Sequence, residues 1–352
     1  MSIGFSPRVL HVVYSLDELN MLFSHQKKIV ESLLDTNPNA QIISINDKKH
    51  LGEKIVAGAR VWSINWVPGQ TFFNLLKFYT IILSVMLRFR PKCVFVHMAD
   101  LHCLLLAPLA KIVGCRIYLW YAHKNFSTSL FLVQPFLTGI FTSTKDSCPI
   151  KSKKVRIVGQ AISEDEFEFV GRKLPLRKAV YLGRLDRIKG IGQIVEEVER
   201  SLQSCLLDSI DFFGAPSNGA EKDWFDKQLS VFKMKYPWFE DSLRGPIKRN
   251  ELNSVLKTYD IFFNAYRGSL DKVLIEATML GIPVVTLNVE YANEFSLDSE
   301  FFTQSLFDQV KSYSSLNQAE LDRTLKLRRE IAISKHGLRQ WVEKVSSVIN
   351  EN

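Results

Sequence analysis

Short apolar runs alternate with amphipathic stretches along the whole chain. Runs such as RVLHVVYS (8–15), CVFVHM (93–98) and IFFNAY (261–266) have the length and the β-branched and aromatic content of buried strands. Between them, stretches such as HQKKIVESLLDT (25–36) and IGQIVEEVERSL (191–202) place apolar residues at the spacing of one helix face. This alternation favours an α/β fold with parallel sheets that carry helices on both faces.

The alternation extends over two regions, and a chain of 352 residues suits two domains. We predict one Rossmann-like domain at 1–165, a second at 166–335, and a C-terminal helix at 336–352 that packs on the N-terminal domain or elsewhere. Ligands of open parallel sheets bind at the carboxyl ends of strands, so two facing sheets would hold a substrate in a cleft. Further strands are expected at 40–46, 61–66, 116–123, 177–185, 209–215 and 282–288, and further helices at 101–114, 221–234 and 251–260.

One predicted helix, TFFNLLKFYTIILSVMLRF (71–89), is unusually apolar. Asn74 and Lys77 interrupt it, and its uninterrupted apolar part is shorter than the roughly 20 residues that a membrane-spanning helix needs. We therefore expect a buried helix of the α/β domain. A helix that is partly in contact with a membrane is the alternative.

Charge is distributed unevenly along the chain. Residues 1–165 contain 19 Lys and Arg against 10 Asp and Glu, whereas residues 166–352 contain 26 against 27. The basic half is expected to face an anionic partner, such as membrane lipid, an acidic acceptor or nucleic acid. Nucleic acid is disfavoured, because the aromatic residues lie within apolar runs rather than between Lys and Arg.

The expected location is the cytoplasm, at the inner face of a membrane. The five cysteines form no CxxC, and the N-terminus lacks the apolar run of a signal peptide, which favours a reducing compartment and disfavours a zinc site. Lys48, Lys49, Lys54 and Arg60 lie in or near predicted loops and suit peripheral contact with an anionic membrane.

The stretch RGSLDKVLIEATMLGIPVV contains candidate chemistry. Ser269 is suited to cap a helix at about 270–280, and Gly281 is suited to end it. This helix would begin at the carboxyl end of the preceding strand, where its first amides and Lys272 favour an anion such as phosphate. Glu276, one turn later, would bind the adjacent hydroxyls of a ribose; a surface ion pair with Lys272 is the alternative.

A second strand–loop–helix unit, YLGRLDRIKGIGQIV, carries basic residues in its loop. Arg184, Arg187 and Lys189 lie there beside Gly183 and Gly190, in neither a GxGxxG nor a Walker pattern. Such a loop fits a diphosphate that is neutralised by side chains. The sequence contains no DxD triplet, which argues against a diphosphate held by a metal.

The stretches YLGRLDRIKGI, LRGPIKRNELNSVLKTYDIFFNAY and SLDKVLIEATMLGIPVV, in this order, resemble glycosyltransferase family 4. Its members are retaining, metal-independent sugar transferases of the GT-B fold. The resemblance covers most of residues 177–288 and is looser in the N-terminal half. It implies an N-terminal acceptor-binding domain and a C-terminal domain that binds a nucleotide-sugar donor across a central cleft, with no cofactor and no metal.

The resemblance also implies roles for individual residues. Arg184 and Lys189 would contact the donor diphosphate and stabilise the charge that develops as the sugar leaves. Glu276 would bind the ribose, and His123 would lie near the transferred sugar. The other implied donor-binding residues are Gly183, Pro246, Ile247, Ser269, Leu270, Asp271, Lys272 and Val273.

One position departs from the family's pattern. Eight residues before Glu276, where the family often has a second Glu, this chain has Gly268, and Asp271 is expected to contact the sugar instead. The predicted function is retaining transfer, of hexosyltransferase type, to an acceptor hydroxyl of a glycan, polysaccharide or lipid-linked saccharide. Two alternatives stay open: a nucleotide-sugar epimerase of similar fold, and an inactive binding or scaffold protein, which Gly268 favours.

Overall fold

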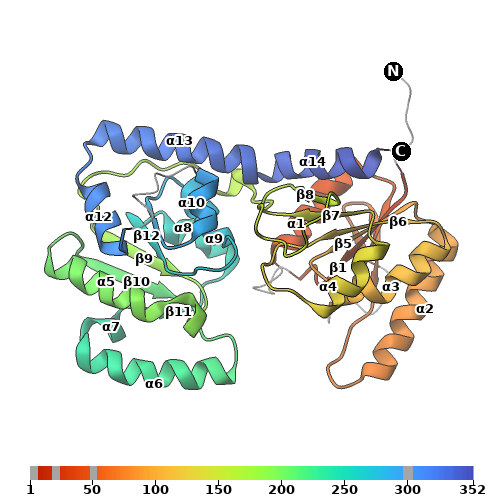
Figure 1. Cartoon of the computed structure of the whole chain (residues 1–352), viewed down its shortest axis with the longest axis horizontal. Helices are drawn as coiled ribbons and strands as arrows, with labels where there is room; N and C mark the ends of the chain where they lie inside the picture. The colour runs from red at the N-terminus through yellow and green to blue at the C-terminus, as the bar shows by residue number, and fades with distance from the viewer. Residues whose placement is uncertain (1–6, 18–23, 48–53, 296–303, 352) are drawn as a thin grey trace. The chain divides into compact units, whose positions relative to one another are not determined.

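The chain folds into two α/β domains, each built around its own sheet (Figure 1). The computed structural model describes residues 7–17, 24–47, 54–295 and 304–351. One compact unit comprises Met1–Ala161 with Leu338–Asn352, and is called the N-terminal domain; the other, Ile162–Gly337, is called the C-terminal domain. The prediction of an α/β fold with two Rossmann-like, parallel-sheet domains is confirmed.

The N-terminal domain contains an eight-stranded sheet with the order β3-β4-β2-β1-β5-β6-β7-β8. All neighbouring strands are parallel except β3 and β4, an antiparallel hairpin that the alternation did not predict. The strands are β1 (Val9–Val13), β2 (Ala40–Ser44), β3 (Lys54–Val56), β4 (Ala59–Ser63), β5 (Cys93–His97), β6 (Arg116–Trp120), β7 (Gly139–Thr142) and β8 (Val155–Ile157). The helices are α1 (Ser24–Thr36), α2 (Thr71–Phe89), α3 (Asp100–Ile112), α4 (Thr128–Val133), η1 (Gln134–Phe136) and α14 (Leu338–Asn350).

Alternate residues of the central strand β1 build two separate cores. Leu10 and Val12 pack with α2 and α3 on one face of the sheet. Val9 and Val13 pack with α1 and α14 on the other face. This is why all five residues of β1 are buried and four of them are apolar: a strand covered by helices on both faces has no side that faces water.

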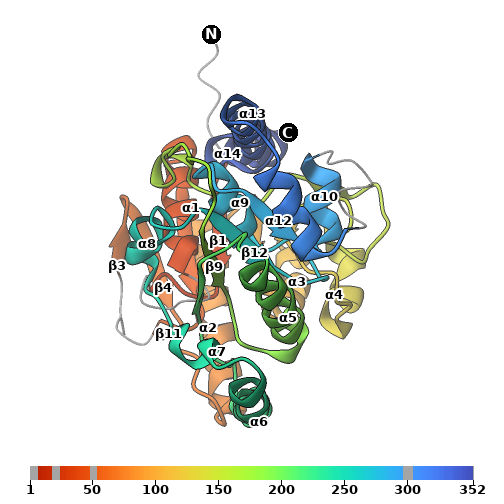
Figure 2. The same ribbon diagram turned by 90° about the vertical axis from the view of Figure 1, so that its left-hand side faces the viewer.

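The C-terminal domain contains a five-stranded, fully parallel sheet with the order β11-β10-β9-β12-β13. Helix α5 lies over strands β9 and β12, towards the viewer in Figure 2. The strands are β9 (Lys178–Leu182), β10 (Ser209–Phe213), β11 (Leu243–Gly245), β12 (Ile261–Asn264) and β13 (Val284–Thr286). The helices are η2 (Glu164–Glu166), η3 (Arg187–Lys189), α5 (Ile191–Gln203), α6 (Gly219–Lys235), α7 (Trp238–Asp241), η4 (Arg249–Glu251), α8 (Leu252–Leu256), α9 (Lys272–Met279), α10 (Val289–Phe295), α12 (Leu306–Ser314) and α13 (Gln318–His336).

Helix α2 forms where it was predicted, but only one of its faces is buried. Asn74, Phe78, Ile82, Val85 and Met86 face the core. The expectation of a buried helix is wrong for the opposite face, which exposes five large apolar side chains: Phe72, Phe73, Leu76, Leu83 and Leu87. Within the described part of the chain, α2 is the one helix long and apolar enough to cross a membrane. Of its most apolar 18-residue stretch, 28% is buried.

The last helix, α14, belongs to the N-terminal domain. Its Trp341 is fully buried and lies 4.9 Å from the Trp120 ring and 6.2 Å from the Phe95 ring, measured between ring centroids. The Arg116 guanidinium donates to the carbonyl of Ile349 at 2.9 Å. The chain therefore returns to its first domain after the second is complete.

Candidate functional site

The loop after β9 presents Arg184 at the carboxyl edge of the C-terminal sheet. The Arg184 guanidinium lies 3.1 Å from the Asp186 carboxylate, which is buried while Arg184 is half-exposed. Asp186 also accepts the backbone N–H of Ser217 at 2.9 Å, and the Tyr181 hydroxyl donates to the carbonyl of Arg184 at 2.7 Å. These contacts hold the loop while the cation still faces solvent.

Lys189 joins this loop to the loop that follows β12. Its ammonium lies 2.6 Å from Asp271 Oδ2 and 3.7 Å from the centre of the Tyr266 ring. The Asn264 amide donates to the same carboxylate oxygen at 3.4 Å. Lys189 is buried, so its charge is balanced by a carboxylate and an aromatic face rather than by water.

Glycine makes this close approach of the two loops possible. Gly190 has a left-handed backbone, with φ of 69°, and a Cβ there would lie 2.8 Å from the Cβ of Ala265. Strands β9 and β12 are hydrogen-bonded neighbours, so their carboxyl ends meet at one edge. A side chain at 190 would push the two loops apart.

The charges of both loops act on Tyr266. Burial raises the pKa of Tyr266, the charge of Asp271 raises it further, and the charge of Arg184 lowers it. Arg184 therefore acts on the same ring that Lys189 contacts. We call Arg184, Lys189, Tyr266 and Asp271 the strand-end cluster.

Helix α9 begins beside this cluster, two residues later than predicted. Asp271, not Ser269, is the N-cap, with an extended backbone and no capping hydrogen bond from its side chain. The prediction of a Ser269 cap is wrong, since the helix begins only at Lys272. Ahead of it, Glu290 accepts the backbone N–H of Leu270 at 3.0 Å. Amides of a helix's first turn have no partner within the helix and point along its axis towards an incoming anion.

Lys272, the first residue of α9, is set to change charge near neutral pH. Burial lowers its pKa to about 7; the neighbouring Glu276 carboxylate opposes this, and the Arg249 guanidinium adds to it. A new anion near the first turn would favour the charged form. The fraction of Lys272 that is protonated near neutral pH therefore depends on whether an anion is bound beside it.

Glu276 is buried and faces Arg249. The guanidinium of Arg249 binds Glu276 with one nitrogen and Glu166 with another, the latter at 3.0 Å. The alternative of a surface ion pair between Glu276 and Lys272 is wrong, since Glu276 is only 4% exposed. Contact of Glu276 with a ribose stays a prediction.

The loop after β11 brings Pro246 and Ile247 to the same edge of the sheet. Pro246 is exposed and Ile247 is half-buried. Arg249, two residues after Ile247, ties this loop to α9 through Glu276. The residues predicted to flank the nucleobase are thereby linked to the residue predicted to bind the ribose.

Gly268 has no room for the glutamate that the family often carries there. A Cβ at 268 would lie 2.1 Å from both Cζ and the hydroxyl oxygen of Tyr266. The Asn288 amide fixes the surrounding loop, because it donates to the carbonyls of Tyr266, Gly268 and Ser269 at 2.9, 3.2 and 3.3 Å. Tyr266 thus occupies the space of the missing side chain.

Sequence reasoning missed Tyr266, Asn288 and the partner role of Arg249. Tyr266 and Asn288 both stand just after apolar runs, at the carboxyl ends of strands, and that position was the available signal. Val273 lies in the first turn of α9, as expected, and Gly183 directly follows β9.

The remaining predicted positions lie in the N-terminal domain. His123 is exposed just after β6, and its ring meets that of Tyr121 edge-on at 5.7 Å. His97, by contrast, is buried in β5 and lies 3.2 Å from the His11 ring nitrogen. Lys48 and Lys49 fall outside the described residues.

Comparisons with known proteins identify the fold. Neither protein-family models nor curated proteins gave a match. Sucrose-phosphate synthase from Thermosynechococcus elongatus is similar in structure, with a TM-score of 0.72 and 13% identity over 97% of this chain and 98% of that chain. Anabaena HepE in complex with UDP is similar with a TM-score of 0.71 and 10% identity, over 98% of this chain and 100% of that chain. The pneumococcal O-GlcNAc transferase GtfA, in complex with UDP and GlcNAc, is similar with a TM-score of 0.63 and 12% identity, over 98% of this chain and 99% of that chain.

These similarities cover nearly the whole of this chain and of each matched chain, and they define the class of fold: the chain has the GT-B fold that known glycosyltransferases share. At this level of identity they establish the fold alone. Membership of family 4 stays a prediction.

Proposed function

We propose that this protein is a glycosyltransferase that moves a sugar from a nucleotide-diphosphate donor to an acceptor hydroxyl. One observation carries the proposal: Arg184, Lys189 and the first turn of α9 gather at the carboxyl edge of one sheet, in a chain with the GT-B fold. Two similar structures, HepE and GtfA, hold UDP, which supports a nucleotide donor.

The reaction needs stabilisation of the leaving group. As the bond from the anomeric carbon to the diphosphate oxygen breaks, negative charge develops on that oxygen. Lys189 has three N–H donors; one binds Asp271 and the Tyr266 ring lies against the ammonium, so a further N–H is left for a phosphate oxygen. Arg184 and the amides of α9 add fixed positive charge, and preorganised charge of this kind is commonly the largest catalytic contribution.

We infer retention of configuration and independence from metals from the family resemblance and from the absence of DxD. The acceptor hydroxyl would attack from the face that the leaving group vacates, and the diphosphate would take its proton, so no protein nucleophile is assigned. His123 is proposed to lie near the transferred hexose, and Asp271 to contact it. A glycan, polysaccharide or lipid-linked saccharide is the proposed acceptor.

A panel of nucleotide sugars, tested for thermal stabilisation with and without EDTA, identifies the donor. An assay for released nucleotide with candidate acceptors then tests transfer, and NMR of the product's anomeric proton tests retention. Binding without turnover on any acceptor would favour the scaffold alternative. Conversion of the donor sugar without an acceptor would favour the epimerase.

The cytoplasmic location, the peripheral contact with an anionic membrane and the cleft between the domains stay predictions. Each has a direct test: cell fractionation, vesicle flotation and scattering with and without donor.

A further inference from the structure

The exposed face of α2 carries an apolar stripe with one threonine in it. Its residues Phe73, Leu76, Leu83 and Leu87 are 59%, 57%, 44% and 68% exposed, and Thr80 completes their three- and four-residue spacing. At 100° per residue these positions fall within an arc of about 80°, and the stripe is about 21 Å long. Apolar residues gathered in this way on a surface mark an interaction site.

The chain around the stripe is almost free of carboxylates. Residues 54–145 contain ten Lys and Arg and a single acidic residue, Asp100, which accepts a hydrogen bond from the Ser127 hydroxyl. Lys77 and Arg88 lie on α2 itself, both on one flank of the stripe by helical spacing. The excess positive charge of the N-terminal half therefore comes from the region that contains the stripe.

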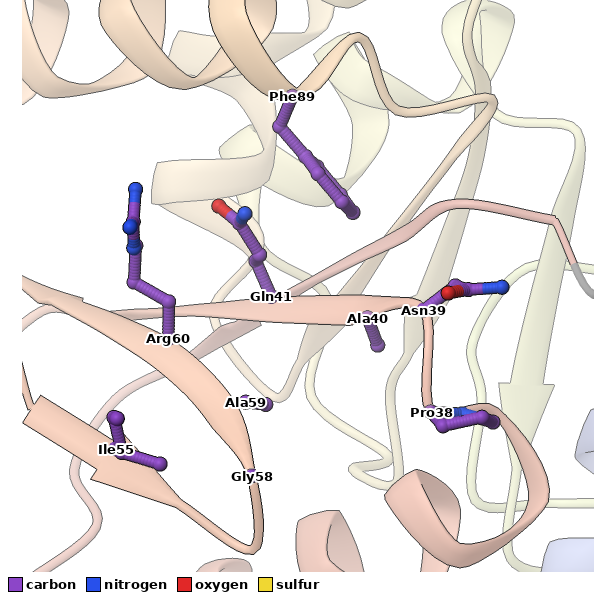
Figure 3. Close-up of a pocket in the computed structure, with 9 residues that line it drawn as sticks. All are labelled: Pro38, Asn39, Ala40, Gln41, Ile55, Gly58, Ala59, Arg60 and Phe89. Atoms are coloured by element: carbon purple, nitrogen blue, oxygen red, sulfur yellow. The ribbon is translucent and has the colours of Figure 1, made fainter.

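A basic pocket adjoins the C-terminal end of α2. A cavity of about 190 Å³ is lined by Arg8, Arg60, Arg88 and Trp62. It shares Gln41, Arg60 and Phe89 with a neighbouring cavity of about 570 Å³, where these three side chains project towards the same space (Figure 3). No carboxylate lines either cavity among the residues described.

Side-chain contacts shape this pocket. Trp62 donates its indole N–H to Gln41 Oε1 at 3.1 Å, and the Arg60 guanidinium lies 5.6 Å from the Trp62 ring centre. Arg8 precedes β1, and Arg60 is the second residue of β4. The pocket therefore lies at the amino ends of parallel strands, the opposite edge from that used by ligands of such sheets.

We propose that the α2 stripe and the adjoining arginine pocket dock the protein on an anionic phospholipid bilayer. The stripe enters the boundary between headgroups and acyl chains, and the arginines bind the phosphate of a lipid headgroup. The helix lies in the plane of the interface and does not span the bilayer, since its other face, including Phe78 and Ile82, is part of the domain core. This docking does not depend on the proposed sugar transfer.

The charge around the α2 stripe favours a lipid bilayer, rather than a second copy of this chain, as the partner that covers it. A stripe with this spacing also fits a helix–helix seam. In a symmetric pair, however, Lys77 and Arg88 of one copy would meet the same basic surface of the other, and residues 54–99 contain no acid to match them. An anionic lipid surface supplies that missing negative charge.

Vesicle flotation of the full chain tests the proposal, with phosphatidylcholine alone or mixed with about one third phosphatidylglycerol. The stripe variant is Leu76→Gln/Leu83→Gln/Leu87→Gln. Its matched control, Val231→Gln/Met234→Gln/Leu327→Gln, changes side chains that are 49%, 81% and 56% exposed on the C-terminal domain. We expect the stripe variant to bind anionic vesicles about tenfold more weakly or worse, and the control to bind as the parent does.

A second variant tests the charges without touching the stripe. Arg8→Gln/Arg88→Gln is expected to weaken binding to anionic vesicles about 25-fold, at about fivefold for each charge, with little change on neutral vesicles. Equal binding to neutral and anionic vesicles, or unchanged binding of the stripe variant, would overturn the proposal. A dimer seen by analytical ultracentrifugation and lost in the stripe variant would also overturn it, since a second copy would then cover α2.

Discussion

Lys189 and Asp271 form an ion pair whose two members act oppositely on a bound diphosphate. Their charged atoms lie 2.6 Å apart, and Lys189 is buried. The lysine attracts a phosphate, whereas the carboxylate repels it but holds the lysine in place. The two effects can be separated only by changing both residues.

We predict that Lys189→Met weakens binding of nucleotide diphosphates about a hundredfold, because it removes one cation and leaves Asp271 uncompensated. Adding Asp271→Asn should recover about tenfold of the affinity while nucleotide release stays slow. Titration calorimetry and a release assay measure the two quantities. If the double variant binds no better than the single one, Asp271 does not face the phosphates.

Position 268 is glycine here, where glycosyltransferase family 4 often has glutamate. We predict that restoring the glutamate does not raise activity. A glutamate at 268 would collide with the Tyr266 ring, which rests on Lys189. Gly268→Glu should therefore lower activity and stability rather than raise activity. Tyr266→Ser in the same chain should relieve the collision, and Tyr266→Ser alone is the control. Higher activity of Gly268→Glu by itself would show that Tyr266 moves aside at no cost.

Lys272 makes donor binding depend on pH. Its pKa of about 7 in the protein would rise beside a phosphate, so binding takes up a proton. Affinity should be flat below pH 7 and fall by up to about tenfold per pH unit between pH 7.5 and 9, where the phosphate itself is already ionised. Calorimetry across this range measures the slope. Lys272→Met should remove it, and an equal slope in that variant would assign the proton to another group.

At the scale of elements, the sequence predicts which segments are helix or strand better than it predicts what they contact. The apolar run of α2 predicts a helix, but apolar residues lie on both its buried and its exposed face, so the sequence does not show which side meets water. Helix α13 was not predicted, since its sequence is largely polar and charged and gives almost no periodic signal. The β3–β4 hairpin was not predicted: a strand was expected at 61–66, where β4 overlaps it, but β3 has only three residues and gives no alternating signal.

The candidate site was predictable only in part, for a related reason. Basic residues and glycines after strands mark the edge where Lys189 and Asp271 meet, because parallel strands end together. Arg249 and Glu276 lie 27 residues apart, and only the path of the intervening loops brings them into contact. The helix begins at Lys272 with Asp271 as its cap, and the segment before it is held by Glu290 of another element through the Leu270 amide, a contact that local sequence does not show.

The contact of Arg249 with Glu276 and Glu166 connects three elements: η4, α9 and η2. Arg249→Met would leave the Glu276 carboxylate buried without its cation, and should destabilise the C-terminal domain by about 2–4 kcal/mol. Glu276→Gln in the same chain should restore part of this stability. Urea unfolding measures both variants. Equal stability of Arg249→Met and the parent would show that Glu276 is solvated or protonated instead.

At the scale of the whole molecule, one domain is built from two separate segments of the chain and the other from a single segment. The C-terminal domain is one continuous segment, Ile162–Gly337, and contains the entire strand-end cluster. The N-terminal domain is interrupted, since its core includes Trp341 and Val345 of α14 together with β1 and β5. The last helix thus completes the domain that begins the chain.

This division predicts that the domains differ in independence. Residues 162–337 expressed alone should fold and bind nucleotide diphosphates within a fewfold of the full chain. Residues 1–161 alone should be unstable, because they leave exposed the surface that Trp341 and Val345 cover. Burial of a large aromatic and a valine side chain is worth about 4–6 kcal/mol together.

Joining 338–352 to residue 161 through a flexible linker should restore cooperative unfolding, whereas the same linker with Trp341→Ala and Val345→Ala should not. Circular dichroism and calorimetry distinguish these outcomes, and a stable fragment 1–161 would mean that α14 only covers a domain that is already complete.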